Sequence, residues 1–127
     1  MEKILNIAGK AFFSIPFLAF GVRHFLHASA MAVSVPIPGG GVFWIYLTGA
    51  AQILFVVSIW IGKYAKLASV LLALMLVIIA FSIQLWDSFS PESKMFSLIN
   101  LYKDLGLAGG ALILASYFTG KEKKEVI

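Results

Sequence analysis

Four long apolar stretches separated by short polar segments dominate the chain. They cover about residues 4–28, 42–62, 67–86 and 98–118. A helix needs about 20 residues to cross the hydrocarbon core of a bilayer, and each stretch supplies roughly that number. The pattern therefore predicts an all-α protein, a bundle of four transmembrane helices.

The segments between these stretches are short and read as loops. A Pro/Gly run, VPIPGGG, occupies residues 35–41, a basic turn residues 63–66, and a polar loop residues 87–94. A charged tail, residues 119–127, ends the sequence. No internal repeat or long linker interrupts this order, so we expect residues 1–127 to form a single membrane domain.

Composition supports lipid as the solvent. Of the 127 residues, 61% are hydrophobic and 13% charged, whereas soluble domains carry about 25% charged residues. The lipid bilayer is thus the expected partner, and the cell (plasma or inner) membrane the expected location of a multi-pass protein. The sequence has no cysteine, which excludes disulfides and thiolate chemistry. The net charge of +4 predicts no nucleic-acid partner, because the lysines lie at helix ends, as membrane topology requires.

Basic residues at the ends of the spans alternate in a way that fixes an orientation. Lys3 precedes the first span, Lys63 and Lys66 join the second to the third, and a group of lysines beginning at Lys121 follows the fourth. Only Lys94 lies in the other set of loops. The positive-inside rule then places both termini in the cytoplasm.

The first span has an alternative interpretation as a cleaved signal peptide. Ala28, Ser29 and Ala30 have the small-residue form of a cleavage site. Against cleavage, Arg23 and His24 interrupt the apolar run just before that site. Loss of the span would also spoil the alternation of charge, so we favour a retained helix.

Polar residues at membrane depth are the candidate functional residues, since an ionisable group at the bilayer centre costs at least about 2.5 to 3.5 kcal/mol. They fall in two groups at the same predicted outer leaflet: Arg23, His24 and His27 near the end of the first span, and Asn100, Lys103 and Asp104 near the start of the fourth. A bidentate guanidinium–carboxylate contact would satisfy two of these charges. We therefore hypothesise an Arg23–Asp104 pair.

Two amides and several aromatic residues extend this polar outer half. Gln52 lies near the middle of the second span and Gln84 near the outer end of the third, and Trp44 and Trp86 could form walls of a pocket. The alternative is structural: membrane amides often join helices, and Trp commonly belongs to the interfacial aromatic belt. Both interpretations remain open on the sequence.

His24 and His27 share a helical face, as do many pairs of metal ligands. A third ligand would have to come from Asp104 or Asn100, so the metal signal is weak and no metal is expected. A proton relay, a quinone contact or a plain interfacial role are the alternatives for these histidines. The small residues of two segments, Thr48–Ala51 and Gly106–Gly110, indicate close helix packing.

The order of elements resembles the DoxX family of small four-helix membrane proteins. Three segments carry the resemblance: FGVRHF at residues 20–25, YLTGAAQIL at 46–54, and NLYKDLGLAGG at 100–110. The last segment is the most specific, because an Asn–Leu–x–Lys–Asp run before Leu-Ala-Gly-Gly is frequent in the family. This chain departs from the family at Gln52, where Glu is usual, and at Gln84, near which His is often found.

The resemblance implies an accessory or ligand-binding subunit of a membrane redox system, with quinone or another hydrophobic small molecule as ligand and a membrane or peripheral redox partner protein. As an enzyme it would be at most a membrane subunit of a thiosulfate:quinone-type oxidoreductase. No residue set here performs electron chemistry unaided, so a cofactor or partner must supply it. A non-catalytic assembly or chaperone-like membrane partner is the alternative function. A small transporter ranks third, because Asp104, the only membrane-embedded acid, has Lys103 beside it.

Overall fold

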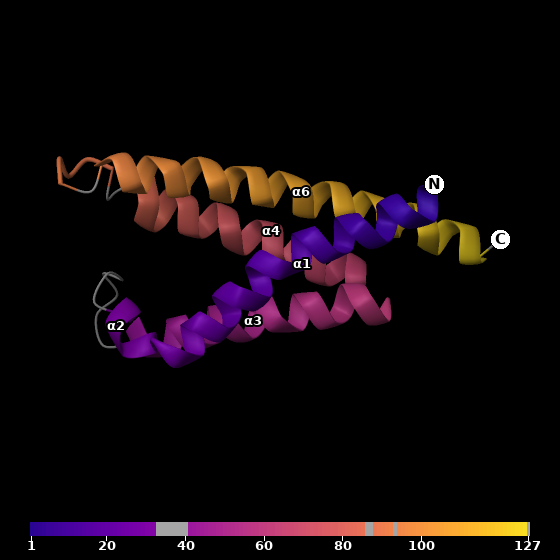
Figure 1. Cartoon of the computed structure of the whole chain (residues 1–127), viewed down its shortest axis with the longest axis horizontal. Coiled ribbons are helices and arrows are strands. Elements are labelled where there is room, and N and C mark those ends of the chain that lie inside the picture. Colours follow the sequence, from indigo (N-terminus) through magenta and orange to yellow (C-terminus); the bar gives the residue numbers. More distant parts are fainter. Residues whose placement is uncertain (33–40, 86–87, 93, 127) are drawn as a thin grey trace. The chain divides into compact units, whose positions relative to one another are not determined.

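The computed structural model describes residues 1–32, 41–85, 88–92 and 94–126, and these ranges contain helices and turns but no strand. In chain order the helices are α1 (Glu2–Leu26), α2 (Ala28–Ala32), α3 (Gly41–Ile61), α4 (Ala65–Ile79), the π-helical segment η1 (Ala80–Gln84) and α6 (Lys94–Val126) (Figure 1). The all-α prediction is confirmed for the described residues.

Four helical stretches in the described residues are long and apolar enough to cross a membrane: Glu2–Leu26, Gly41–Ile61, Ala65–Gln84 and Lys94–Lys121. Large apolar side chains such as Phe12, Leu54 and Ile113 stay mostly exposed. Leaving such a side chain in water forgoes about 1.5 to 3 kcal/mol, so lipid is the solvent that suits this surface. The prediction of four candidate spans and of a multi-pass membrane protein is confirmed.

Two boundaries differ from those expected. The first span ends at Leu26, because His27 leaves the helix as its C-cap before the short α2 begins. The predicted charged tail, residues 119–127, is not a separate segment: α6 continues through it to Val126. Lys and Glu are good helix formers, so this polar stretch extends the helix that precedes it.

The chain forms two compact units, Met1–Tyr64 and Ala65–Ile127. Each unit is a helical hairpin, in which α3 runs back along α1 and α6 runs back along α4 (Figure 1). The turn between them contains Gly62 and Tyr64, both with positive φ (77° and 58°). A single membrane domain made of both hairpins stays a prediction.

Aromatic packing holds the N-terminal hairpin together near its centre. The rings of Phe13 and Phe17 on α1 lie 5.9 and 5.4 Å from the ring of Phe55 on α3, in edge-to-face arrangements. This geometry brings the positive edge of one ring to the negative face of another. Nearby, Trp60 Nε1 donates a 2.9 Å hydrogen bond to Ser14 Oγ, which ties the same two helices.

Further along this hairpin, two glycines let α1 and α3 touch. A Cβ placed on Gly21 would lie 3.1 Å from the carbonyl oxygen of Gly49 and 2.7 Å from a side-chain carbon of Ile53. A Cβ on Gly49 would meet His24 Cβ at 2.7 Å. Both positions therefore exclude a side chain, which confirms the packing role expected of the segment around Gly49.

The C-terminal hairpin packs along a seam of small residues. The buried positions of α6 repeat every three and four residues: Ser97, Leu101, Asp104, Ala108, Ala111, Ala115 and Phe118. Opposite them, α4 and η1 bury mainly Ala65, Ser69, Leu72, Ala73, Leu76 and Ala80. Such spacing keeps one face of each helix toward its neighbour, and small residues bring the backbones close. Gly106 and Gly109 are not part of this seam, because nothing lies within 4 Å of where their Cβ atoms would be.

The glycine contact gives a direct test of the N-terminal hairpin. We expect Gly21→Ala to lower the free energy of unfolding by about 1–3 kcal/mol, since the added carbon overpacks a contact with backbone. Thermal unfolding in detergent measures this. Gly9→Ala on the same helix is the matched control, because nothing lies within 4 Å of its Cβ position; equal melting shifts in the two variants would contradict the close contact.

Candidate functional site

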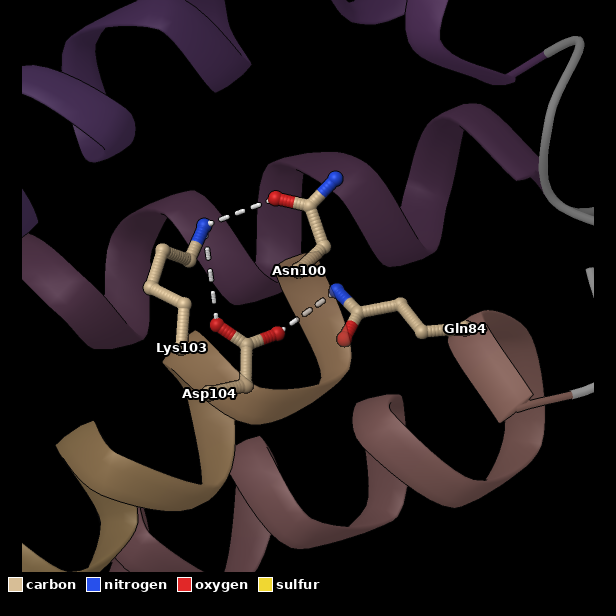
Figure 2. A network of polar contacts seen from close by, with 4 residues as sticks. All are labelled: Gln84, Asn100, Lys103 and Asp104. Carbon is tan, nitrogen blue, oxygen red and sulfur yellow. Dashed lines mark hydrogen bonds and ion pairs between the residues drawn. The ribbon is translucent and has the colours of Figure 1, made fainter. Parts of the chain in front are cut away.

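Four polar side chains form a connected network in the C-terminal hairpin (Figure 2). Gln84 Nε2 donates a 2.6 Å hydrogen bond to Asp104 Oδ2. The other carboxylate oxygen, Oδ1, lies 3.7 Å from Lys103 Nζ. Lys103 Nζ in turn donates to Asn100 Oδ1 at 3.2 Å. The amide of Gln84 in η1 and the carboxylate of Asp104 in α6 thus join these two elements.

The periodicity of α6 explains where these groups lie. Asn100, Lys103 and Asp104 are spaced i, i+3 and i+4, so they gather on adjoining parts of one helical turn. Asp104 occupies a position of the buried seam and is only 5% exposed. Lys103 lies beside the seam, with 41% of its side chain exposed. The carboxylate is therefore enclosed, while the ammonium group can reach the surroundings.

On the opposite helix, Gln84 is the last residue of the π segment η1. The backbone N–H of Leu85 bonds to the carbonyl of Ala80, five residues back, as in a π turn. A π turn bonds residues five apart where an α turn bonds residues four apart, so it adds one residue to the turn. The side chain of Gln84 leaves this segment toward α6, where its Nε2 reaches Asp104 Oδ2. Short π segments of this kind occur frequently at functional sites.

Two buried amide oxygens, Gln84 Oε1 and Gln52 Oε1, have no hydrogen-bond partner among the described residues. A buried polar atom left without a partner costs about 1–3 kcal/mol. For Gln84 the oxygen lies next to a network that already uses its Nε2. The network thus offers an unused acceptor at Gln84 together with the ammonium donors of Lys103, which suits a ligand that carries both oxygen acceptors and hydroxyl donors.

The remaining residues proposed from the sequence are not among the four side chains of this network. Arg23 and His27 are exposed on and just after the last turn of α1. Trp44 is 43% exposed at the start of α3, and Trp86 lies outside the described residues. Tyr46, on the helix that carries Trp44, packs its ring against Phe25 of α1.

His24 and Gln52 belong to the N-terminal hairpin, and both are at least partly buried there. Among the described residues, no group of three His, Cys, Asp or Glu side chains is placed to hold a metal. The Arg23–Asp104 pair would link the two hairpins and stays a prediction. Within its own hairpin Asp104 already has two partners, Gln84 and Lys103.

The direct Gln84–Asp104 bond was missed on the sequence, where Asp104 was matched with Arg23 by depth and charge. The sequence does contain an indication of this bond. Asp104 belongs to a series of residues spaced three and four apart, with Leu101, Ala108, Ala111 and Ala115. That spacing places the carboxylate on the face that meets the neighbouring helix of a short-looped hairpin. A partner on the preceding span was thus the nearest choice.

Comparison with family models, with curated proteins and with solved structures finds no match for this chain.

The network predicts a measurable coupling between α6 and the π segment. Gln84→Leu and Asp104→Leu should each destabilise the protein, and the double variant should lose about 1–2 kcal/mol less than their sum, because hydrogen bonds to charged groups are strong but are weakened by competing partners in membranes. Denaturant unfolding in mixed micelles measures the cycle.

Thr119→Val combined with Gln84→Leu is the control cycle for this measurement. Thr119 Oγ1 bonds to Ala115 O within its own helix, so the two losses should simply add. Additivity in the Gln84–Asp104 cycle as well would rule out an energetically important bond.

Proposed function

We propose that this chain is a DoxX-like integral membrane protein that binds a quinone-like hydrophobic molecule through the polar network of its C-terminal hairpin, as an accessory subunit of a membrane redox system. The observation that carries the proposal is the pairing of buried Asp104 with Gln84, whose Oε1 keeps an unused acceptor. A pair of side chains that only joined the two helices would not require an unsatisfied oxygen.

The residues of the network fit both forms of such a ligand. Lys103 presents ammonium donors to a quinone carbonyl from a side chain that is 41% exposed. Gln84 Oε1 would accept a hydrogen bond from the hydroxyl group of the reduced form. Asp104 holds the amide of Gln84 through its Nε2 and so fixes the direction of that oxygen. When bound, the quinone supplies the electron chemistry, and these side chains bind and orient its ring.

A binding measurement tests the proposal directly. Purified protein in detergent should bind decylubiquinone saturably, and Lys103→Met should weaken binding about tenfold, which corresponds to one charge-assisted hydrogen bond. Equilibrium dialysis against a micelle blank separates binding from partitioning.

Lys66→Met is the matched control, because Lys66 is exposed in the first turn of α4, far along the chain from the network. It removes the same charge and should leave the affinity unchanged. Absence of saturable binding to the unmodified protein would refute the quinone proposal, and equal losses in both lysine variants would refute the role of Lys103.

We also propose that both termini face the cytoplasm of a plasma or inner membrane, so that the network lies in the outer half of the bilayer. The support is the order of basic residues along the chain: Lys3 precedes the first span, Lys63 and Lys66 join the second to the third, and Lys121 ends the fourth, whereas Lys94 alone begins the fourth span. A ligand would then reach the network from the outer leaflet.

The orientation can be read by cysteine labelling, since the natural sequence has no cysteine to remove. With a membrane-impermeant maleimide on intact cells, we expect Lys94→Cys to react and Lys66→Cys to react only after permeabilisation. Both positions are exposed. The reverse pattern would place the termini outside, in conflict with the positive-inside rule.

One observation favours the second candidate, a non-catalytic assembly or chaperone-like partner. Gly106 and Gly109 present a face of α6 on which nothing lies within 4 Å of a Cβ position. A helix of another protein could approach closely there. Stoichiometric co-purification of a membrane protein that is lost in Gly106→Leu, with no quinone binding, would favour this alternative over the first.

A further inference from the structure

The neutral ring of His24, in the N-terminal hairpin, is held in one tautomer by a bond to its own helix. Its Nδ1 lies 2.5 Å from the carbonyl oxygen of Phe20. A carbonyl oxygen only accepts, so Nδ1 must carry the proton and donate it. In the neutral ring this leaves Nε2 without a proton, and Nε2 is then a hydrogen-bond acceptor. The bond to Phe20 thus leaves Nε2, the ring nitrogen farther from the backbone, as a hydrogen-bond acceptor.

Gln52 supplies a second acceptor in the same hairpin. The residue is 5% exposed, and its Oε1 has no partner among the described residues. Two other polar side chains of this hairpin do have partners: Thr48 Oγ1 donates to Ile45 O within α3, and Trp60 Nε1 donates to Ser14 Oγ across the two helices. The amide oxygen of Gln52 is therefore the exception that calls for an explanation.

Helix geometry brings these two acceptors to one flank of the contact between α1 and α3. The helices are antiparallel and touch at Gly21 and Gly49. His24 follows Gly21 by three residues on α1, and Gln52 follows Gly49 by three residues on α3. Each side chain is therefore rotated about its own helix axis by the same angle away from the contact. Because the helices run in opposite directions, equal turns point to the same side.

The side chains also lean toward each other. In a helix each Cα–Cβ bond tilts toward the N-terminus. His24 lies beyond the contact along α1, and Gln52 lies beyond it along α3, in the opposite direction. Each therefore leans back toward the contact, and the bond from His24 to Phe20 has this direction.

We infer that His24 Nε2 and Gln52 Oε1 form a site for a group that donates two hydrogen bonds. Two acceptors cannot bond to each other, so an O–H or N–H donor must lie between them for both to be satisfied. The occupant is a neutral hydroxyl-type donor, either a water molecule or the hydroxyl group of an amphiphile. The site belongs to the N-terminal hairpin and does not depend on the quinone proposal.

Nitrogen NMR of the histidine ring tests the inference. In a His27→Asn background His24 gives the only histidine ring signals. They are recorded from ¹⁵N-labelled protein in deuterated detergent. We expect a protonated Nδ1 and an unprotonated Nε2 whose shift shows that it accepts a hydrogen bond. A protonated Nε2, or an Nε2 shift typical of a nitrogen without any bond, would overturn the site.

Substitution of the second acceptor tests whether the two act together. Gln52→Leu should move the Nε2 signal toward that of a nitrogen without a bond, because the bridging donor loses its other partner. Thr48→Val is the matched control on α3, since the Thr48 hydroxyl is satisfied by Ile45 O. An Nε2 signal unchanged in Gln52→Leu would refute the shared site, and the measurement on the Gln52-containing protein stands even if this variant fails to fold.

Two further arms identify the source of the donor. A cross-peak from water to the His24 ring in deuterated detergent identifies a bound water. A response of Nε2 to added decanol, but not to decyl methyl ether, identifies an amphiphile hydroxyl. If the signal shows neither contact, no donor occupies the position and the inference is wrong.

Discussion

Hydrocarbon offers no hydrogen-bond partner, and this constraint governs the described structure. Helices satisfy the backbone internally, and polar side chains must find partners within the protein. Most do so over one turn: Ser69 donates to Ala65 O at 2.7 Å, and Thr119 donates to Ala115 O. Against this background the unpartnered oxygens of Gln52 and Gln84 are conspicuous. They mark the two places where we propose that another molecule supplies the partner.

The two hairpins meet the same constraint with different packing. The N-terminal hairpin combines large rings around Phe55 with a bare backbone contact at Gly21 and Gly49. The C-terminal hairpin uses a seam rich in alanine, in which Asp104 is the one charged residue among the buried positions described. Each hairpin also contains one glutamine whose side-chain oxygen is buried and has no partner among the described residues. A charged residue is tolerable in the second hairpin because Gln84 and Lys103 both contact it.

The sequence was sufficient for what hydrophobicity determines and insufficient for what side-chain direction determines. Four spans followed from the length of the apolar stretches, since lipid imposes that length. The helical tail to Val126 was missed because its polar residues carry no apolar signal, although they favour helix. Gln84, which bonds Asp104, lies in a π turn, and nothing in the hydropathy pattern around Ala80 distinguishes such a turn from an α turn. The tautomer of His24 likewise requires the position of one carbonyl oxygen.

The length of α6 has a mechanical consequence. Its 33 residues give a rod of about 50 Å, whereas the hydrocarbon core is about 30 Å thick. The helix must therefore tilt strongly or project into water. In either case it is a single uninterrupted helix. Asp104 lies about a third of the way along it, fastened to the neighbouring helix. Because the buried seam from Ser97 to Phe118 also holds the rod against α4, the two helices of this hairpin would tilt together as one body.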